Sequence, residues 1–160
     1  MNLDTLLIQL QSWAQEETVA QRRLSGVLEA LERAVRTGGS EELLRTGLAL
    51  EESFTGNVGR EVRRVDLMGR LGRHWGIAPA TLSLTSVIAR ASAEGRPTSA
   101  LEKLRDELRV VVLDVTRRAK LLNVVAAQHR GVLADLMNIL GTSSDDESAR
   151  TAGVLVDAEG

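Results

Sequence analysis

One long amphipathic helix is encoded by residues 99–140, which read SALEKLRDELRVVVLDVTRRAKLLNVVAAQHRGVLADLMNIL. Apolar side chains recur in this stretch every three or four positions, the spacing that places them on one face of an α-helix. A helix of about 40 residues is about 60 Å long at 1.5 Å per residue. We expect this row to face the core, and its residues are Leu101, Leu104, Leu108, Val111, Val115, Ala119, Leu122, Ala126, His129, Leu133, Leu136 and Leu140.

The same stretch carries a second row of apolar residues on another face of the predicted helix. One apolar stripe is enough for a helix to join a bundle, so the second row predicts a binding surface for another protein. Together with an apolar island near the end of the chain, the predicted surface comprises Val110, Leu113, Leu121, Val124, Val132, Ile139, Val154, Leu155 and Val156. The alternative is a central helix that is buried on two faces. Gln128 and Asp135 interrupt the second row and favour exposure of its C-terminal half.

Two further long helices and a short one are expected before this segment. Residues 3–36 show helical apolar spacing, and Gly38 with Gly39 ends the helix because glycine is the usual residue past a helix C-terminus. Residues 41–75 form a second long helix, and a short third helix begins at residue 80 or 81 and ends near residue 93. No strand pattern is found. The sequence therefore predicts an all-α fold, an antiparallel bundle of long, coiled-coil-like helices with one short inserted helix.

The chain is expected to divide near residue 141. Residues 1–141 form the predicted helical bundle. Residues 142–160 are polar and acidic and are expected to be disordered, with the apolar island of residues 154–156 inside them.

The second long helix has the least decisive pattern. Its predicted core row is Leu43, Leu50, Phe54, Val58, Val62, Val65, Met68, Leu71 and Trp75. Glycines at positions 47, 56, 59, 69 and 72 lie within it, and each costs roughly 0.5–1 kcal/mol relative to alanine in a helix interior. Close packing against another helix is the favoured explanation for these glycines. A hinge between Gly56 and Gly59 is the alternative, so the continuity of this helix is left open.

The composition argues against an enzyme. Aromatic residues make up 2% of the chain and cysteine is absent, which excludes disulfides, thiolate catalysis and cysteine-ligated zinc. His74 and His129 are far apart in sequence, and no metal-binding or phosphate-binding motif is present. We therefore expect no catalytic residue, no metal and no cofactor. His129 falls on the first apolar row and is expected to be a core or boundary residue.

Charge and hydropathy point to neither nucleic acid nor a membrane as a partner. Twenty basic residues stand against 22 acidic ones, whereas a nucleic-acid-binding domain is usually basic. One basic cluster is interpreted as a solvated helix face or as a partner of acidic residues in the first helix: Arg60, Arg63, Arg64, Arg70 and Arg73. No stretch approaches the ~20 apolar residues of a membrane span, and the N-terminus does not read as a secretory signal. A cytoplasmic location is therefore expected.

Several of these elements together resemble the FlgN-like family of flagellar export chaperones. The resemblance covers roughly residues 3–140. It is carried by the glycine turn after the first helix and by a second helix with early glutamates (Glu51-Glu52) and late arginines (Arg63-Arg64). A Leu-Gly-Arg-His-Trp-Gly segment at residues 71–76, the start of the short helix at Pro79, and Asn123 within the long final helix complete it. The number of glycines in the second helix and the absence of tyrosine depart from the family pattern.

The resemblance implies a cytoplasmic chaperone for bacterial flagellum biogenesis. Such chaperones bind hook–filament junction proteins, prevent their premature assembly and deliver them to the type III export apparatus. The amphipathic final helix would hold a client helix against its second apolar row. A helical scaffold or oligomerisation module without export clients is the alternative, and whether the chain forms a homodimer is left open.

Overall fold

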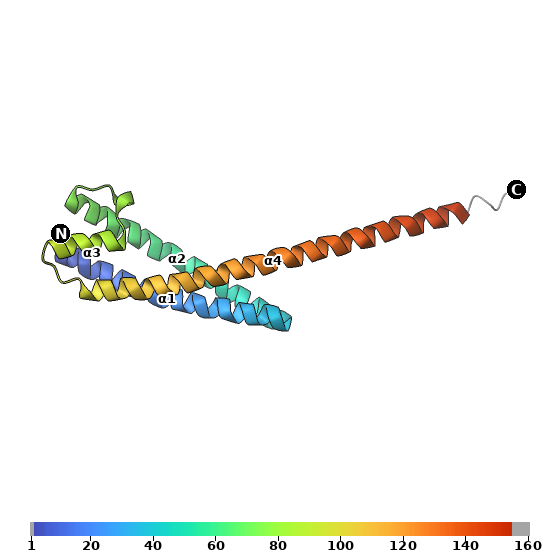
Figure 1. Cartoon of the computed structure of the whole chain (residues 1–160), viewed down its shortest axis with the longest axis horizontal. Helices are drawn as coiled ribbons and strands as arrows, with labels where there is room; N and C mark the ends of the chain where they lie inside the picture. The colour runs from blue at the N-terminus through green and yellow to red at the C-terminus, as the bar shows by residue number, and fades with distance from the viewer. Residues whose placement is uncertain (1, 155–160) are drawn as a thin grey trace. The chain divides into compact units, whose positions relative to one another are not determined.

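The protein is all-helical in a computed structural model that describes residues 2–154, with side chains described through Gly131 and at Asp135. These residues form α1 (Leu3–Thr37), α2 (Ser40–Trp75), the single 3-10 turn η1 (Pro79–Thr81), α3 (Leu84–Ala93) and α4 (Ser99–Val154), with no strand among them (Figure 1). The predicted all-α class is therefore confirmed.

The chain divides into two compact units, Met1–Ala119 and Lys120–Gly160. The first unit holds α1, α2, η1, α3 and the beginning of α4, and the described part of the second unit is the remainder of α4. The helix continues to Val154, past Leu140, where the sequence pattern ended it. A single glycine such as Gly141 costs only about 0.5–1 kcal/mol, which does not by itself end a helix. The division into a bundle at 1–141 and a tail at 142–160 stays a prediction.

The ends of α1 and α2 follow from their capping residues. The side chain of Asn2 accepts a hydrogen bond from the backbone N–H of Asp4 and caps α1. Gly38 ends α1 with a φ of 70°, and its N–H donates to the carbonyl of Ala34. The N-cap of α2 is Gly39, so Ser40 is the first helical residue. The helix then runs unbroken to Trp75, without the hinge considered for residues 56–59.

The short third helix begins later than its sequence pattern predicted. Residues 79–81 form η1, and α3 starts at Leu84. Ser83 and Ser86 form a capping box, in which each side chain accepts a hydrogen bond from the other residue's backbone N–H. This reciprocal pair satisfies two backbone donors at the start of α3 and sets its N-terminus there.

The core lies at one end of the first unit, where the start of α1 meets the end of α2, α3 and the start of α4. Leu10, Leu71 and Val87 have no exposed surface and form its centre. Buried residues of α1, α2 and α3 form one cluster there with Leu82 and Leu101, and the exposed fraction of each core residue is 8% or less. The cluster consists of Leu3, Leu6, Leu7, Leu10, Trp13, Ala14, Leu67, Met68, Leu71, Leu82, Val87, Ile88, Ala91 and Leu101.

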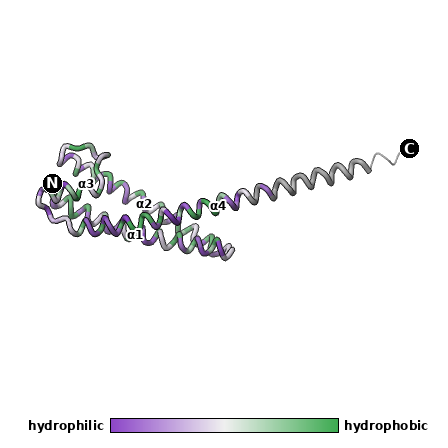
Figure 2. The backbone as a smooth tube through the Cα atoms, viewed as in Figure 1, coloured by the Kyte–Doolittle hydropathy of each residue, from purple (hydrophilic) through white to green (hydrophobic). Residues whose placement is uncertain are grey.

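Beyond this core, α1 and α2 continue as an antiparallel pair that buries Leu28 and Ala34 and is also joined by polar contacts. The indole Nε1 of Trp13 donates to the carbonyl of Arg60 at 3.1 Å. The Arg60 guanidinium donates to Glu17 at 2.9 Å, so this glutamate of α1 is paired across the contact with α2. Figure 2 shows apolar and polar residues alternating along both helices.

The predicted core row of α2 is wrong over its middle section. Phe54, Val58, Val62 and Val65 are all exposed, with exposed fractions between 56% and 66%. The face of α2 that meets α1 here carries half-buried polar residues, Ser53 and Arg60 among them. At 100° per residue the four apolar side chains lie on the opposite face of the helix.

Candidate functional site

The second apolar row of α4 is exposed wherever its side chains are described. Val110 and Leu113, in the first unit, are 68% and 61% exposed. Leu121 and Val124, in the second unit, are 54% and 55% exposed. The alternative of a helix buried on two faces is therefore wrong for these four residues. The side chains of Val132, Ile139 and Val154, and the residues Leu155 and Val156, lie outside the described part of the structure.

Within the first unit, the first apolar row of α4 is buried or half-buried, as expected from its spacing. Leu101 is buried in the core, and the residues that follow on the row, from Leu104 to Ala119, are half-buried. His129 is exposed, so its predicted place in the core is wrong. In the second unit Leu122 of this row is half-buried and Ala126 is exposed, and spacing alone could not predict this difference.

Polar contacts attach α4 to α1 at three levels. Arg22 pairs with Glu107 at 2.9 Å, and the Ser25 hydroxyl donates to Asp114 at 2.5 Å. One level further along, Arg118 pairs with Glu32 at 3.1 Å. These contacts hold α4 on α1. At 100° per residue Glu107, Asp114 and Arg118 lie between the first apolar row of α4 and its exposed second row.

Asp114 is the electrostatic centre of this contact. The hydrogen bond from Ser25, with further hydrogen bonds from Arg118 and Arg117, holds the pKa of the Asp114 carboxyl well below its usual range. The same contact with Asp114 raises the pKa of Arg118. The Asp114 carboxylate therefore stays ionised at neutral pH and is satisfied by neighbours within the chain, which leaves it no acid–base role.

Four arginines of the α2 cluster, Arg60, Arg63, Arg64 and Arg70, pair with carboxylates. Arg60 and Arg63 reach Glu17 and Glu16 on α1. Arg64 pairs with Glu61 within α2, and this hydrogen bond lowers the pKa of Glu61. The interpretation of the cluster as a partner of the acidic residues in the first helix is confirmed for its first two members.

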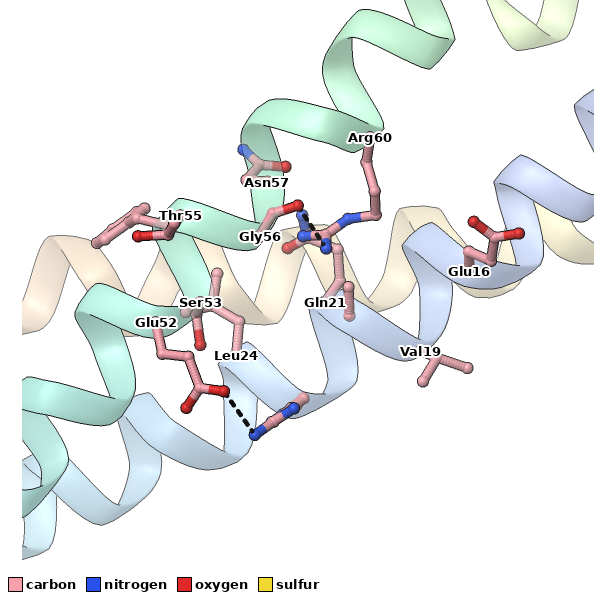
Figure 3. Close-up of a pocket in the computed structure, with 13 residues that line it drawn as sticks. Glu16, Val19, Gln21, Leu24, Glu52, Ser53, Thr55, Gly56, Asn57 and Arg60 are labelled. Carbon is pink, nitrogen blue, oxygen red and sulfur yellow. Dashed lines mark hydrogen bonds and ion pairs between the residues drawn. The ribbon is translucent and has the colours of Figure 1, made fainter.

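A groove of about 460 Å³ lies between α1 and α2 (Figure 3). Its charged groups bind acceptors and donors of the chain itself: Arg60 reaches Glu17 and the carbonyl of Gly56, and Arg23 reaches Glu52 at 3.7 Å. No histidine is among the residues that line it. The groove thus offers mixed apolar and polar surface, and no nucleophile paired with a base.

Neither a metal cluster nor a membrane-spanning helix is found in the described part of the chain. No three residues of the His, Asp and Glu types come close enough there to hold a metal ion. Among residues 2–154 no helix combines the length and apolar character that crossing a bilayer requires.

The outer face of α2 is the surface that the sequence pattern missed. Six large apolar side chains on it are at least 56% exposed: Leu44, Leu48, Phe54, Val58, Val62 and Val65. We call this set the α2 row. Its spacing equals that of a core row, so the periodicity could not distinguish it from one. The polar residues that recur on the opposite face, such as Thr46, Ser53 and Arg60, were the available signal.

Packing within the chain does not explain most of the glycines in α2. A Cβ at Gly47 or Gly59 would meet nothing within 4 Å, and one at Gly69 would meet only the Arg73 guanidinium at 3.9 Å. The favoured explanation of close helix packing is therefore wrong for these positions. Gly72 differs, because a Cβ there would lie 2.6 Å from the carbonyl oxygen of Ile77. That close neighbour belongs to the loop after α2.

Comparison of the chain with models of known protein families, with curated proteins and with solved structures finds no match.

Proposed function

We propose that this protein is a non-enzymatic chaperone that binds an amphipathic helix of a client protein along α4. The observation that carries the proposal is the exposure of Val110 and Leu113, each more than half exposed in the first unit, where the first apolar row of α4 is buried or half-buried. In the second unit Leu121 and Val124 are also more than half exposed. Large apolar side chains that recur at helical spacing on a surface are the usual means of holding a helix through its apolar face.

The chemistry of the row favours a releasable interaction. Arg117 lies between Leu113 and Leu121 on the same face and pairs with Asp114 at 3.0 Å, so a charged group interrupts the apolar surface. A client segment that is disordered before binding gives up several kcal/mol in becoming ordered. Moderate affinity suits a protein that must hand its client on.

We further propose that the clients are hook–filament junction proteins and that delivery is to the flagellar type III export apparatus in the cytoplasm. This part of the proposal rests on the resemblance to FlgN-like chaperones. The order of helices supports it, with two long helices, a short one and a long final one following in the expected sequence. The specific bundle arrangement of that family belongs to the same proposal.

The second candidate is a helical oligomerisation module without export clients. The α2 row favours it, because an exposed apolar face of this length also fits self-association. The two candidates differ in the helix they use and are separable by mutation.

Titration calorimetry with purified hook–filament junction proteins tests the chaperone proposal. We expect saturable binding, and on the order of 100-fold weaker binding for Val110→Glu/Leu113→Glu, since each buried Val or Leu is worth about 1.5–3 kcal/mol. Ile8→Glu is the matched control, because Ile8 on α1 is 68% exposed, as Val110 is. Equal loss in the control, or full binding by the double variant, would remove the α4 row from the interface.

A further inference from the structure

The α2 row forms an exposed apolar stripe in the first unit, interrupted by Glu51 and Thr55. Its six residues lie within an arc of about 120° at 100° per residue, and they extend over about 30 Å of helix. Their exposed fractions run from 56% at Val65 to 67% at Leu44. Together they present on the order of 600 Å² of apolar surface, close to the ~800 Å² that each partner buries in a stable interface.

Glycines leave gaps on the same face. Gly47 and Gly69 lie within the arc of the α2 row, and Gly59 lies at its edge. None of the three is required by a contact within the chain, as shown above. A face that alternates large side chains with glycines can accept the large side chains of another helix at close range.

We propose that the α2 row is the interface of a homodimer in which the α2 helices of two copies pack antiparallel. An antiparallel register in which facing residue numbers add up to 113 pairs large side chains with glycines at two levels, and it places Glu51 opposite Val62 and Thr55 opposite Val58. Leu44 then faces Gly69 of the second copy, Phe54 faces Gly59, and Leu48 faces Val65. In each of the first two pairs a large side chain meets a gap. A parallel pair would place each gap opposite the same gap.

The charges of α2 select the same orientation. Its first third, residues 40–52, carries four carboxylates against one arginine, and its last part, residues 60–73, carries five arginines against two carboxylates. An antiparallel pair brings the acidic part of each helix beside the basic part of the other, whereas a parallel pair places like charges together. Glu51, which is exposed on the row, would lie beside Arg63 of the second copy in this register.

The surface is distinct from the α4 row, so the dimer adds to the proposed function and does not compete with it for residues. Every residue of the proposed interface lies in the first unit.

Sedimentation equilibrium of the full chain tests the dimer, because the monomer mass is 17.3 kDa. We expect twice that mass at micromolar concentration and the monomer mass for Val58→Glu/Val62→Glu. The α4 variant Val110→Glu/Leu113→Glu is the matched control and is expected to remain dimeric. A monomeric wild-type chain, or a dimer that persists in the α2 variant, would overturn the proposal. The proposal would also fail if wild type and α2 variant were both monomeric and only the variant lost client binding. That result would assign the α2 row to the client.

Disulfide trapping tests the orientation, since the chain has no cysteine of its own. An equal mixture of Leu44→Cys and Gly69→Cys is expected to form a covalent heterodimer on mild oxidation. Leu44→Cys alone is expected to give at least 10-fold less of the covalent dimer. Efficient coupling of Leu44→Cys to itself would show a parallel pair and would overturn the antiparallel arrangement.

Discussion

Gly72→Ala should destabilise the fold, although alanine is the better helix former. A Cβ at position 72 would lie 2.6 Å from the backbone oxygen of Ile77 and 3.2 Å from Cγ of Pro79. The loop cannot yield freely, because the backbone N–H groups of Gly76 and Ile77 both donate to the carbonyl of Gly72. Moving the loop to admit the methyl group would stretch the hydrogen bonds that end α2.

The magnitude follows from two opposing effects. Forcing a methyl group into a filled space costs about 1–3 kcal/mol, and replacing a helical glycine by alanine gains about 0.5–1 kcal/mol. The net expectation is a loss of about 0–2.5 kcal/mol in the free energy of unfolding, centred near about 1 kcal/mol. For a chain of this size a loss of about 1 kcal/mol lowers the melting temperature by roughly 2–4 °C.

Gly26→Ala in α1 is the matched control. Gly26 is exposed within the helix, and a Cβ there meets nothing within 4 Å. This variant is expected to gain about 0.5–1 kcal/mol, so the same substitution should have opposite signs at the two positions. Urea unfolding followed by far-ultraviolet circular dichroism measures both. A Gly72→Ala protein as stable as Gly26→Ala would refute the proposed clash with the loop.

Three further predictions concern the core and the contact between α1 and α4. Leu10 has no exposed surface, and Leu10→Ala should lower the free energy of unfolding, measured in urea, by about 2–5 kcal/mol. Ile8 is 68% exposed, and Ile8→Ala should change it by less than about 0.5 kcal/mol. Equal losses would contradict the location of the core. Arg118→Met should cost about 1–3 kcal/mol, because it removes the ionic partner of Glu32, and a neutral result would show that this contact does not hold α4 on α1. The pKa of the Asp114 carboxyl is lowered in the folded state, so its contribution to stability is present above the unfolded pKa of about 4 and is lost as the pH falls toward the folded value. The stability difference between wild type and Asp114→Asn should therefore shrink below about pH 4. A difference that does not change with pH would contradict this role of Asp114.

The helices and their ends could be predicted from sequence because the information is local. The Gly38-Gly39 pair and the recurrence of apolar residues every three or four positions predicted the ends of α1 and α2 to within one residue. The start of α3 was misplaced because two serines, Ser83 and Ser86, cap each other, whereas the pattern of apolar residues begins earlier.

The buried face of α2 could not be predicted because both faces of that helix carry periodic side chains. The α2 row has the spacing of a core row, and the face that packs on α1 is held partly by polar contacts such as Arg60 with Glu17. Periodicity identifies a face but does not say which neighbour covers it. On α4 the same reasoning separated the two rows correctly in the first unit, because the row that meets α1 begins at the buried Leu101 and the other includes the exposed Val110.

Amide hydrogen exchange of the full chain, alone and with a hook–filament junction protein, tests the central claim most directly. If a client helix lies on the α4 row, amides of α4 around residues 110–124 should exchange at least several-fold more slowly in the complex, because binding suppresses local opening of the helix. The face of α1 around Ile8 should be unchanged. A complex that protects only α2, or no change anywhere at saturating client, would contradict the account.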